Sequence, residues 1–107
     1  MQNIYTVAQI NTYIKNMFTQ DYLLQCVQVH GEVSICKYHS SGHIYFTLKD
    51  GKGTINCVMF AGNRTGLKFR LAEGHQVIVG GTIDVYERDG KYQLYAKHIV
   101  PDGSGLL

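Results

Sequence analysis

Alternating hydrophobic and polar residues occupy several short segments of the chain, and glycine-rich turns separate these segments, which is typical of β-strands joined by tight connections. The clearest segment is residues 43–49, in which Ile44, Phe46 and Leu48 are spaced to face a core. The residues between them would share the opposite face of the strand: His43, Tyr45, Thr47 and Lys49. This opposite face is aromatic and basic.

A second strand is predicted at residues 54–60, after a hairpin turn with the sequence DGKG. Its inward set would be Ile55, Cys57 and Met59, and its outward set Asn56, Val58 and Phe60. A sheet surface that carries Tyr45 and Phe60 among lysines and polar groups suits a flat, negatively charged ligand. Single-stranded nucleic acid is such a ligand.

A helix is predicted at residues 6–18, because apolar residues recur there at helical spacing: Val7, Ile10, Ile14, Met17 and Phe18. Thr6 followed by Gln9 forms a capping box, in which each side chain bonds the backbone N–H of the other residue. The sequence therefore predicts an amphipathic helix that starts directly after Thr6.

Three further strands are predicted, at residues 25–37, 75–87 and 91–100. The first contains the alternating residues Val27, Val29, Val33 and Ile35, with Gly31 at a point where the strand can bend. Gly80 and Gly81 form a similar hinge in the second, and Pro101 ends the third. The connection at residues 63–74 is long enough to hold one helical turn.

Five strands, with bends in the first and fourth, match a mainly β protein: a five-stranded Greek-key barrel of the OB type with an N-terminal helix. A β-sandwich would need about seven strands. We expect residues 1–22 to form the helix and its lead-in, residues 23–101 to form the barrel, and residues 102–107 to begin a linker towards a further domain.

Composition agrees with one packed domain, because 107 residues with 45% hydrophobic and 17% charged residues can bury a core. The formal net charge is only +2, so any attraction to phosphate must come from a local group of basic residues. Three cysteines lie in apolar contexts without the spacing of a disulfide framework, which favours reduced, mostly buried thiols. No stretch has the apolar length of a signal peptide or a membrane span, and a cytoplasmic location with no membrane partner is expected.

Several stretches resemble one family, the N-terminal OB domain of the large subunit of bacterial exodeoxyribonuclease VII. They are TVAQINTYIK, VHGEVS, HSSGHIYFTLKD, INCVMF, LKF, EGHQVIVGGTIDVYE and GKYQLYA, and together they cover nearly the whole chain. One position departs from the family: Ala61 stands where a basic residue is common, and Arg64 is the nearest replacement.

The resemblance implies a domain that binds single-stranded DNA and presents it to a nuclease domain further along the polypeptide, which hydrolyses phosphodiester bonds. The catalytic residues would then lie outside these 107 residues. The small subunit of the same exonuclease would bind through the missing C-terminal part. Neither a cofactor nor a metal ion is expected in this domain.

The nucleic-acid-binding residues are predicted on one face of the barrel and on its flanking loops. Tyr45 and Phe60 are expected to stack on bases, because OB domains bind oligonucleotides on the face of their second and third strands. The expected polar and loop contacts are Lys49, Asn56, Arg64, Lys37, Tyr38, His39, His43, Arg88 and Lys91. Tyr86 and Tyr95 are weaker candidates, because such tyrosines are more often part of a core.

Other interpretations of the same residues are weaker or remain open. Cys36, His39 and His43 resemble a metal site only in spacing, because a CxxC pair is absent. The acidic residues follow no catalytic motif, and a surface role is expected for them. RNA binding of the anticodon-recognising kind remains an alternative function, as does a docking module whose exposed aromatic residues contact another protein domain.

Overall fold

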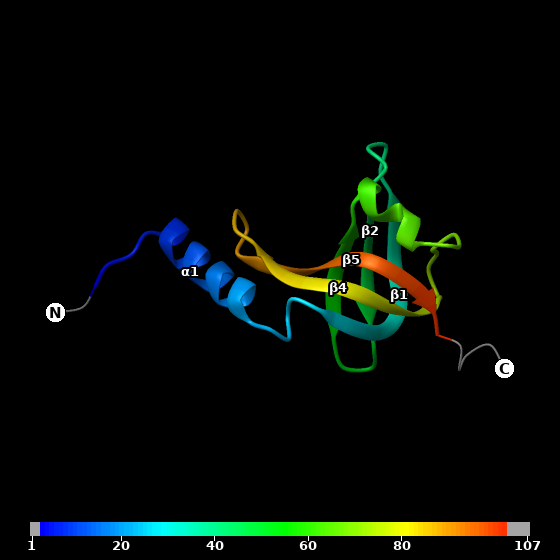
Figure 1. Cartoon of the computed structure of the whole chain (residues 1–107), viewed down its shortest axis with the longest axis horizontal. Helices are drawn as coiled ribbons and strands as arrows, with labels where there is room; N and C mark the ends of the chain where they lie inside the picture. Colours follow the sequence, from blue (N-terminus) through cyan, green and yellow to red (C-terminus); the bar gives the residue numbers. More distant parts are fainter. Residues whose placement is uncertain (1–2, 103–107) are drawn as a thin grey trace.

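The computed structural model describes residues 3–102, which form one helix packed against one end of a β-barrel (Figure 1). The elements are α1 (Val7–Gln20), β1 (Val27–Tyr38), β2 (Ile44–Lys49), β3 (Thr54–Met59), the 3-10 helix η1 (Ala61–Gly66), β4 (Gln76–Tyr86) and β5 (Lys91–Pro101). The five predicted strands are confirmed to within two residues at each end. The helical turn predicted within residues 63–74 begins two residues earlier, at Ala61.

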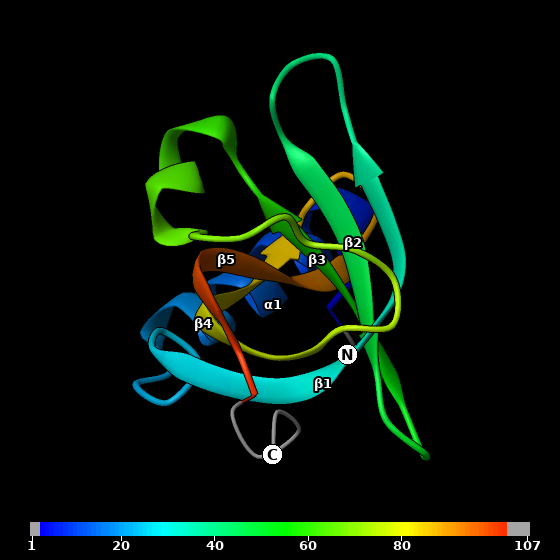
Figure 2. The same ribbon diagram turned by 90° about the vertical axis from the view of Figure 1, so that its right-hand side faces the viewer.

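The strands close into a barrel in the order β1-β2-β3-β5-β4, with β4 paired back to β1 (Figure 2). All neighbouring strands are antiparallel except β3 and β5, which run parallel. β1 pairs with β4 up to Glu32 and with β2 from Glu32 onwards. The bend predicted at Gly31 therefore lies where β1 passes from one partner to the other, as an OB barrel requires.

Close backbone contact explains the glycine hinge of β4. The register of β4 against β5 shifts between Gly80 and Gly81. A Cβ atom at Gly81 would overlap the carbonyl oxygen of Tyr95, which belongs to the neighbouring strand backbone. Only glycine fits there without moving β5.

The core lies inside the barrel and contains the predicted inward residues of β2. Ile44, Phe46 and Leu48 are at most 3% exposed, and Cys57 and Met59 of β3 are buried beside them. The outward assignment of Tyr45 and Lys49 is also confirmed, because both side chains are exposed. The β2–β3 hairpin thus has one apolar face and one face available for ligands.

Ile35 lies on the opposite face from the one predicted, and Val58 lies on its predicted face but is buried. The register of β1 against β2 shifts between Val33 and Ile35, so Ile35 turns outwards and is 49% exposed. Cys36 takes its place and packs against the core. Val58 lies on the outer face as predicted but is only 2% exposed, because neighbouring side chains cover it.

The N-terminal helix begins as predicted. Gln9 donates its backbone N–H to the Thr6 hydroxyl at 3.0 Å, and the Gln9 side chain accepts from the Thr6 N–H at 2.8 Å. This is the expected capping box. It satisfies two of the N–H groups that a helix leaves unbonded at its start.

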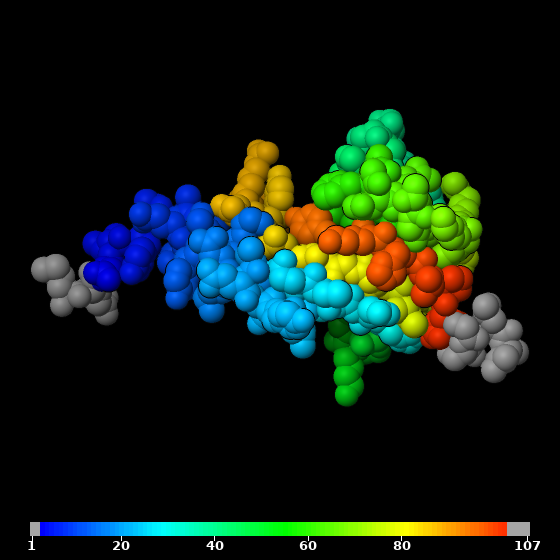
Figure 3. Space-filling view, viewed as in Figure 1, coloured from blue at the N-terminus to red at the C-terminus, as the bar shows by residue number. Residues whose placement is uncertain are grey.

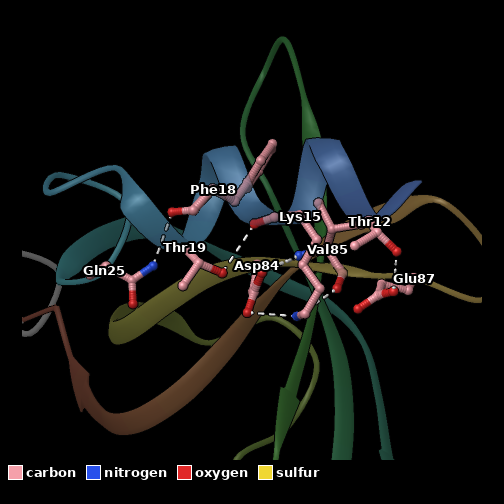
Figure 4. Close-up of polar contacts among 8 residues, drawn as sticks. All are labelled: Thr12, Lys15, Phe18, Thr19, Gln25, Asp84, Val85 and Glu87. Atoms are coloured by element: carbon pink, nitrogen blue, oxygen red, sulfur yellow. Dashed lines mark hydrogen bonds and ion pairs between the residues drawn. The ribbon is translucent and has the colours of Figure 1, made fainter. Parts of the chain in front are cut away.

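Polar groups join α1 to the β4–β5 hairpin (Figure 4). The Lys15 ammonium lies 2.9 Å from the Asp84 carboxylate and 3.2 Å from the Val85 carbonyl oxygen. The Thr12 hydroxyl donates to the Glu87 carboxylate at 2.9 Å. The helix therefore supports the strand ends that lead into the β4–β5 loop.

The apolar side of α1 is largely exposed. Ile10 and Ile14 are 41% and 40% exposed, and Tyr13 and Met17 are more exposed still. Phe18 is the residue of α1 that packs against the core, and its ring lies 6.2 Å from that of Tyr92. No helix within residues 3–102 is long and apolar enough to cross a membrane.

The three cysteines are free thiols with different exposure. Cys57 is buried, Cys36 is half-buried and Cys26 is exposed, so the expectation of buried thiols is wrong for Cys26. The predicted linker at residues 102–107 lies outside the described residues except for Asp102, whose carboxylate is 2.7 Å from the His30 ring.

Candidate nucleic-acid interface

Two rows of side chains cross the outer face of four strands. The first, called the tyrosine row, follows the pairing of Lys37 with Tyr45, of Tyr45 with Val58 and of Val58 with Tyr95. The second, called the amide row, contains Ile35, Thr47, Asn56 and Gln93. Ile35 on β1 pairs with Thr47 on β2, and Thr47 pairs with Asn56 on β3. On β5, Gln93 directly precedes Leu94, which pairs with Cys57 on β3.

Val58 shows how closely the tyrosine row is packed. Its side chain is buried, yet it belongs to the outer face and lies outside the main core cluster. Its two strand partners are Tyr45 and Tyr95, so their rings flank it. The row therefore runs from Lys37 through Tyr45 to Tyr95, with the buried Val58 between the two tyrosines.

Aromatic rings extend this surface beyond the row. Phe60, which follows β3, stacks on Tyr95 with ring centroids 5.8 Å apart. His43 meets the Phe60 ring edge-on at 5.1 Å and the Tyr45 ring at 6.4 Å, and His39 lies 6.0 Å from Tyr45. The structure thus brings the predicted stacking residues Tyr45 and Phe60 into one aromatic cluster, each more than 40% exposed.

Backbone hydrogen bonds fix the tautomers of the two loop histidines. Nδ1 of His43 accepts the backbone N–H of Ala61 at 2.9 Å, and Nδ1 of His39 accepts that of Ser41 at 3.1 Å. A neutral ring that accepts at Nδ1 carries its proton on Nε2. In this tautomer each ring has an Nε2–H group that can donate a hydrogen bond.

The amide row lies in a hollow of about 290 Å³ whose lining includes Tyr45, Lys37 and all four residues of the row. The Thr47 hydroxyl donates to the Asn56 side-chain oxygen at 3.4 Å. A neighbouring hollow of about 300 Å³ is also lined by Asn56 and reaches Lys91. Asn56 lines both hollows, which are together called the groove; Lys37 lines the first hollow and Lys91 the second.

Two loops stand at the sides of this outer face. In Figure 3 the β4–β5 loop (gold) stands apart from the green segments that contain residues 39–43 and η1, and the surface between them is hollowed. Arg88 lies in the β4–β5 loop and is exposed. Arg64 of η1 reaches the other loop, where its guanidinium donates to the Gly42 carbonyl oxygen at 3.4 Å.

Tyr38 and Lys49 are placed differently from the other predicted residues. The Tyr38 hydroxyl donates to the Leu71 carbonyl oxygen at 2.7 Å, and the guanidinium carbons of Arg70 and Arg64 lie 4.3 Å and 5.5 Å from its ring centre. Tyr38 thus supports two arginines. The Lys49 ammonium lies 3.7 Å from the Glu32 carboxylate and lines a separate hollow beside His30.

Sequence reasoning missed or undervalued several residues of this surface. Tyr95 was ranked as a weak candidate, but it stacks on Phe60 and belongs to the tyrosine row. The predicted binding residues do not include Ile35, Thr47 and Gln93 of the amide row. They also omit Arg70, which packs on Tyr38. The alternation of β5 already placed Gln93 and Tyr95 on one face, and the missing signal was the parallel pairing of β5 with β3.

Charges on the groove favour an anionic ligand. Burial raises the pKa of the Tyr95 phenol, so the ring stays neutral at physiological pH. The cationic side chains at the ends of the groove are Lys37 and Lys91.

Residues 3–102 hold no group of three His, Cys, Asp or Glu side chains that could bind a metal ion.

Residues 5–100 match the family described as OB-fold nucleic acid binding domain, and the chain belongs to this family. It is therefore a nucleic-acid-binding domain built on a closed five-stranded barrel. Among curated proteins, the chain matches the N-terminal region of exodeoxyribonuclease 7 large subunits. It is 66% identical over 107 residues to that of Lachnoclostridium phytofermentans and 47% identical over 107 residues to that of Ruminiclostridium cellulolyticum.

The chain covers 27% and 26% of these two relatives, so it spans about a quarter of their length. Solved structures with the same fold include a replication protein A heterotrimer bound to ssDNA, with a TM-score of 0.61, 15% identity, and coverage of 74% of this chain and 58% of that one. Asparaginyl-tRNA synthetase from Pyrococcus horikoshii matches with a TM-score of 0.57, 18% identity, and coverage of 73% and 19%. At such identities the likeness shows the fold alone.

Proposed function

We propose that this domain binds single-stranded DNA along the tyrosine row, as part of an exodeoxyribonuclease large subunit. The bound strand is presented to a nuclease region further along the polypeptide, which hydrolyses phosphodiester bonds. The observation that carries this proposal is the exposed aromatic cluster around Tyr45 and Phe60, with cationic side chains at the ends of the adjoining groove. The names of the relatives support the choice of DNA.

A single strand suits this surface better than a duplex does. Bases in a duplex stack on each other, whereas an unpaired base can place one face on an aromatic ring, for about 1–3 kcal/mol per base. Tyr45 and Phe60 are 43% and 42% exposed, so part of each ring remains available. Val58, whose strand partners are Tyr45 and Tyr95, is buried and does not project over these rings.

Phosphate contacts would come from the groove ends and the loop at 39–43. Lys37 and Lys91 supply charge at opposite ends of the groove. The Nε2–H groups of His39 and His43 supply further donors beside Tyr45. These few, separated cationic groups agree with the formal net charge of only +2. A modest positive charge also suits a DNA strand that has to move through the site.

The activity and partners of the whole protein extend the same proposal. The nuclease active site and the surface that binds the small subunit would lie in the part of the relatives that this chain does not cover. DNA degradation of this kind would take place in the cytoplasm. In this proposal the barrel itself needs neither a metal ion nor a cofactor.

Fluorescence anisotropy with labelled oligonucleotides tests the proposal. A ten-nucleotide single-stranded DNA should bind more tightly than a duplex of the same sequence, and its affinity should fall as salt concentration rises. A matched RNA oligomer should bind less tightly than the DNA. Preference for RNA would instead support the anticodon-type alternative, and equal binding of duplex and single strand would contradict the stacking surface.

The docking alternative predicts contact through the exposed aromatic residues of the barrel, and the structure adds a second apolar surface, the exposed side of α1. Variants separate the two functions, because Met17 lies on the helix and Tyr45 lies on the sheet. Met17→Glu should leave DNA affinity unchanged, whereas Tyr45→Ala should lower it. Normal DNA affinity in Tyr45→Ala, combined with reduced affinity in Met17→Glu, would show that DNA binds to the helix and not to the sheet.

A further inference from the structure

The amide row has the chemistry to recognise a nucleobase, as well as to hold a strand. Asn56 and Gln93 place two side-chain amides in the same hollow as the exposed ring of Tyr45. A hollow of about 290 Å³ is large enough for one base. A base that stacks near Tyr45 would turn its hydrogen-bonding edge towards these amides.

The orientation of Asn56 determines which edge fits. Its side-chain oxygen accepts the hydroxyl proton of Thr47, directly opposite on β2. The Asn56 NH₂ group therefore points away from Thr47 and offers donors to the hollow. An acceptor at position 4 of a pyrimidine, such as a carbonyl oxygen, is complementary to these donors.

Ile35 adds an apolar contact beside the amides. It lines the same hollow and is 49% exposed, because the register shift in β1 turns it outwards. Thymine has both features that this hollow can match, an O4 acceptor and a C5 methyl group. Cytosine carries an amino donor in place of O4, so a donor would face the Asn56 NH₂ group at this position, and it lacks the methyl group.

We propose that Ile35, Thr47, Asn56 and Gln93 form a base-reading subsite that prefers thymine to cytosine. This inference rests on the proposed binding of single-stranded DNA and adds a base preference to it. Asn56 contacts the base in this arrangement. Thr47 acts as a positioning residue, because it holds the Asn56 amide.

The test compares the affinities of dT10, dC10 and dU10 for the wild-type chain and its variants. One additional hydrogen bond should make dT10 bind about 3- to 10-fold more tightly than dC10. The oligomer dU10 keeps O4 but lacks the methyl group, so its affinity should lie between the two. Equal affinities for dT10 and dC10 in the wild type would overturn the base preference and leave the proposed function intact.

Asn56→Asp gives the sharpest result, because it replaces the donors with acceptors. A carboxylate accepts from the cytosine amino group, so the variant should favour dC10 over dT10. The control is Asn16→Asp, which makes the same charge change on the exposed surface of α1 and should keep the wild-type ratio. An unchanged ratio in Asn56→Asp would overturn the assignment of Asn56.

Thr47→Val tests the positioning role. This variant cannot hold the Asn56 amide, so it should reduce the dT10 to dC10 ratio while keeping most of the affinity for dT10. A ratio equal to that of the wild type would contradict the role of Thr47. Failure of every oligomer to bind the wild type would contradict the proposed function itself, a result distinct from the loss of base preference.

Discussion

The ring of Phe60 stacks on the ring of Tyr95, with centroids 5.8 Å apart and planes inclined by 30°. Phe60 directly follows β3, and Tyr95 lies in the middle of β5, so the contact joins two strands that are far apart in sequence. Because Tyr95 packs beside one side of the Phe60 ring, an incoming base has only part of that ring to contact. The Tyr95 ring therefore fixes how Phe60 is presented to a ligand.

Salt dependence should distinguish the groove lysine Lys37 from Lys49. Lys37→Ala should reduce the slope of log K against log salt concentration by about 0.7, the value for one phosphate contact on a single strand. Lys49→Ala should leave the slope nearly unchanged, because its ammonium lies near Glu32 and outside the groove. Anisotropy titrations at four salt concentrations provide both slopes. Equal slopes for the two variants would contradict the assignment of Lys37, and not Lys49, to the DNA-binding groove.

The closure of the barrel should depend on Gly81. Gly81→Ala places a Cβ against the Tyr95 carbonyl oxygen, and the required backbone shift should lower the free energy of unfolding by about 2–3 kcal/mol or more. Gly53→Ala is the matched control, because a Cβ there meets open space and should change stability by less than about 0.5 kcal/mol. Urea unfolding measures both. Equal stability of the two variants would contradict the close contact.

Burial should make Cys57 unreactive, because it raises the pKa of this thiol to about 12. At pH 8 Cys57 should resist iodoacetamide, whereas the exposed Cys26 should react readily. Mass spectrometry of labelled peptides measures the two rates. Labelling of Cys57 as fast as Cys26 in the folded protein would show that β3 is not packed as described.

The same thiol gives a pH dependence of stability. Its pKa is higher in the folded state than its ordinary value of 9.0, so the folded state holds this proton more tightly than the unfolded chain does. Stability from this source is complete below pH 9 and is lost as pH rises towards 12, by up to about 1.4 kcal/mol per pH unit. Cys57→Val should remove this part of the decline between pH 9 and pH 10 in urea unfolding. An identical decline of the free energy of unfolding in the wild type and in Cys57→Val would contradict this role of the Cys57 thiol.

Local sequence patterns were enough to predict the strands and the helix start. Alternation placed Ile44, Phe46 and Leu48 inside, and the pair Thr6 and Gln9 marked the first turn of α1. These features depend on residues close together in the chain, so the sequence shows them directly. The bend at Gly31 could be predicted for the same reason.

Features that depend on distant strands could not be predicted. The register shift after Val33 reverses the face of Ile35, and no residue type in β1 indicates it. Val58 is buried because rings from β2 and β5 flank it, which requires knowledge of both pairings. The parallel pairing of β3 with β5 likewise brings Tyr95 to Phe60, so the candidate site was only partly visible in the sequence.

The most direct test of the binding surface is the affinity of Tyr45→Ala and Phe60→Ala for a labelled dT10, measured by fluorescence anisotropy with circular dichroism to confirm folding. Each ring is more than 40% exposed, so both variants should fold. The loss of one stacked base, worth about 1–3 kcal/mol, should weaken binding about 5- to 100-fold in each. Wild-type affinity in both folded variants would contradict the proposal that this aromatic face binds DNA.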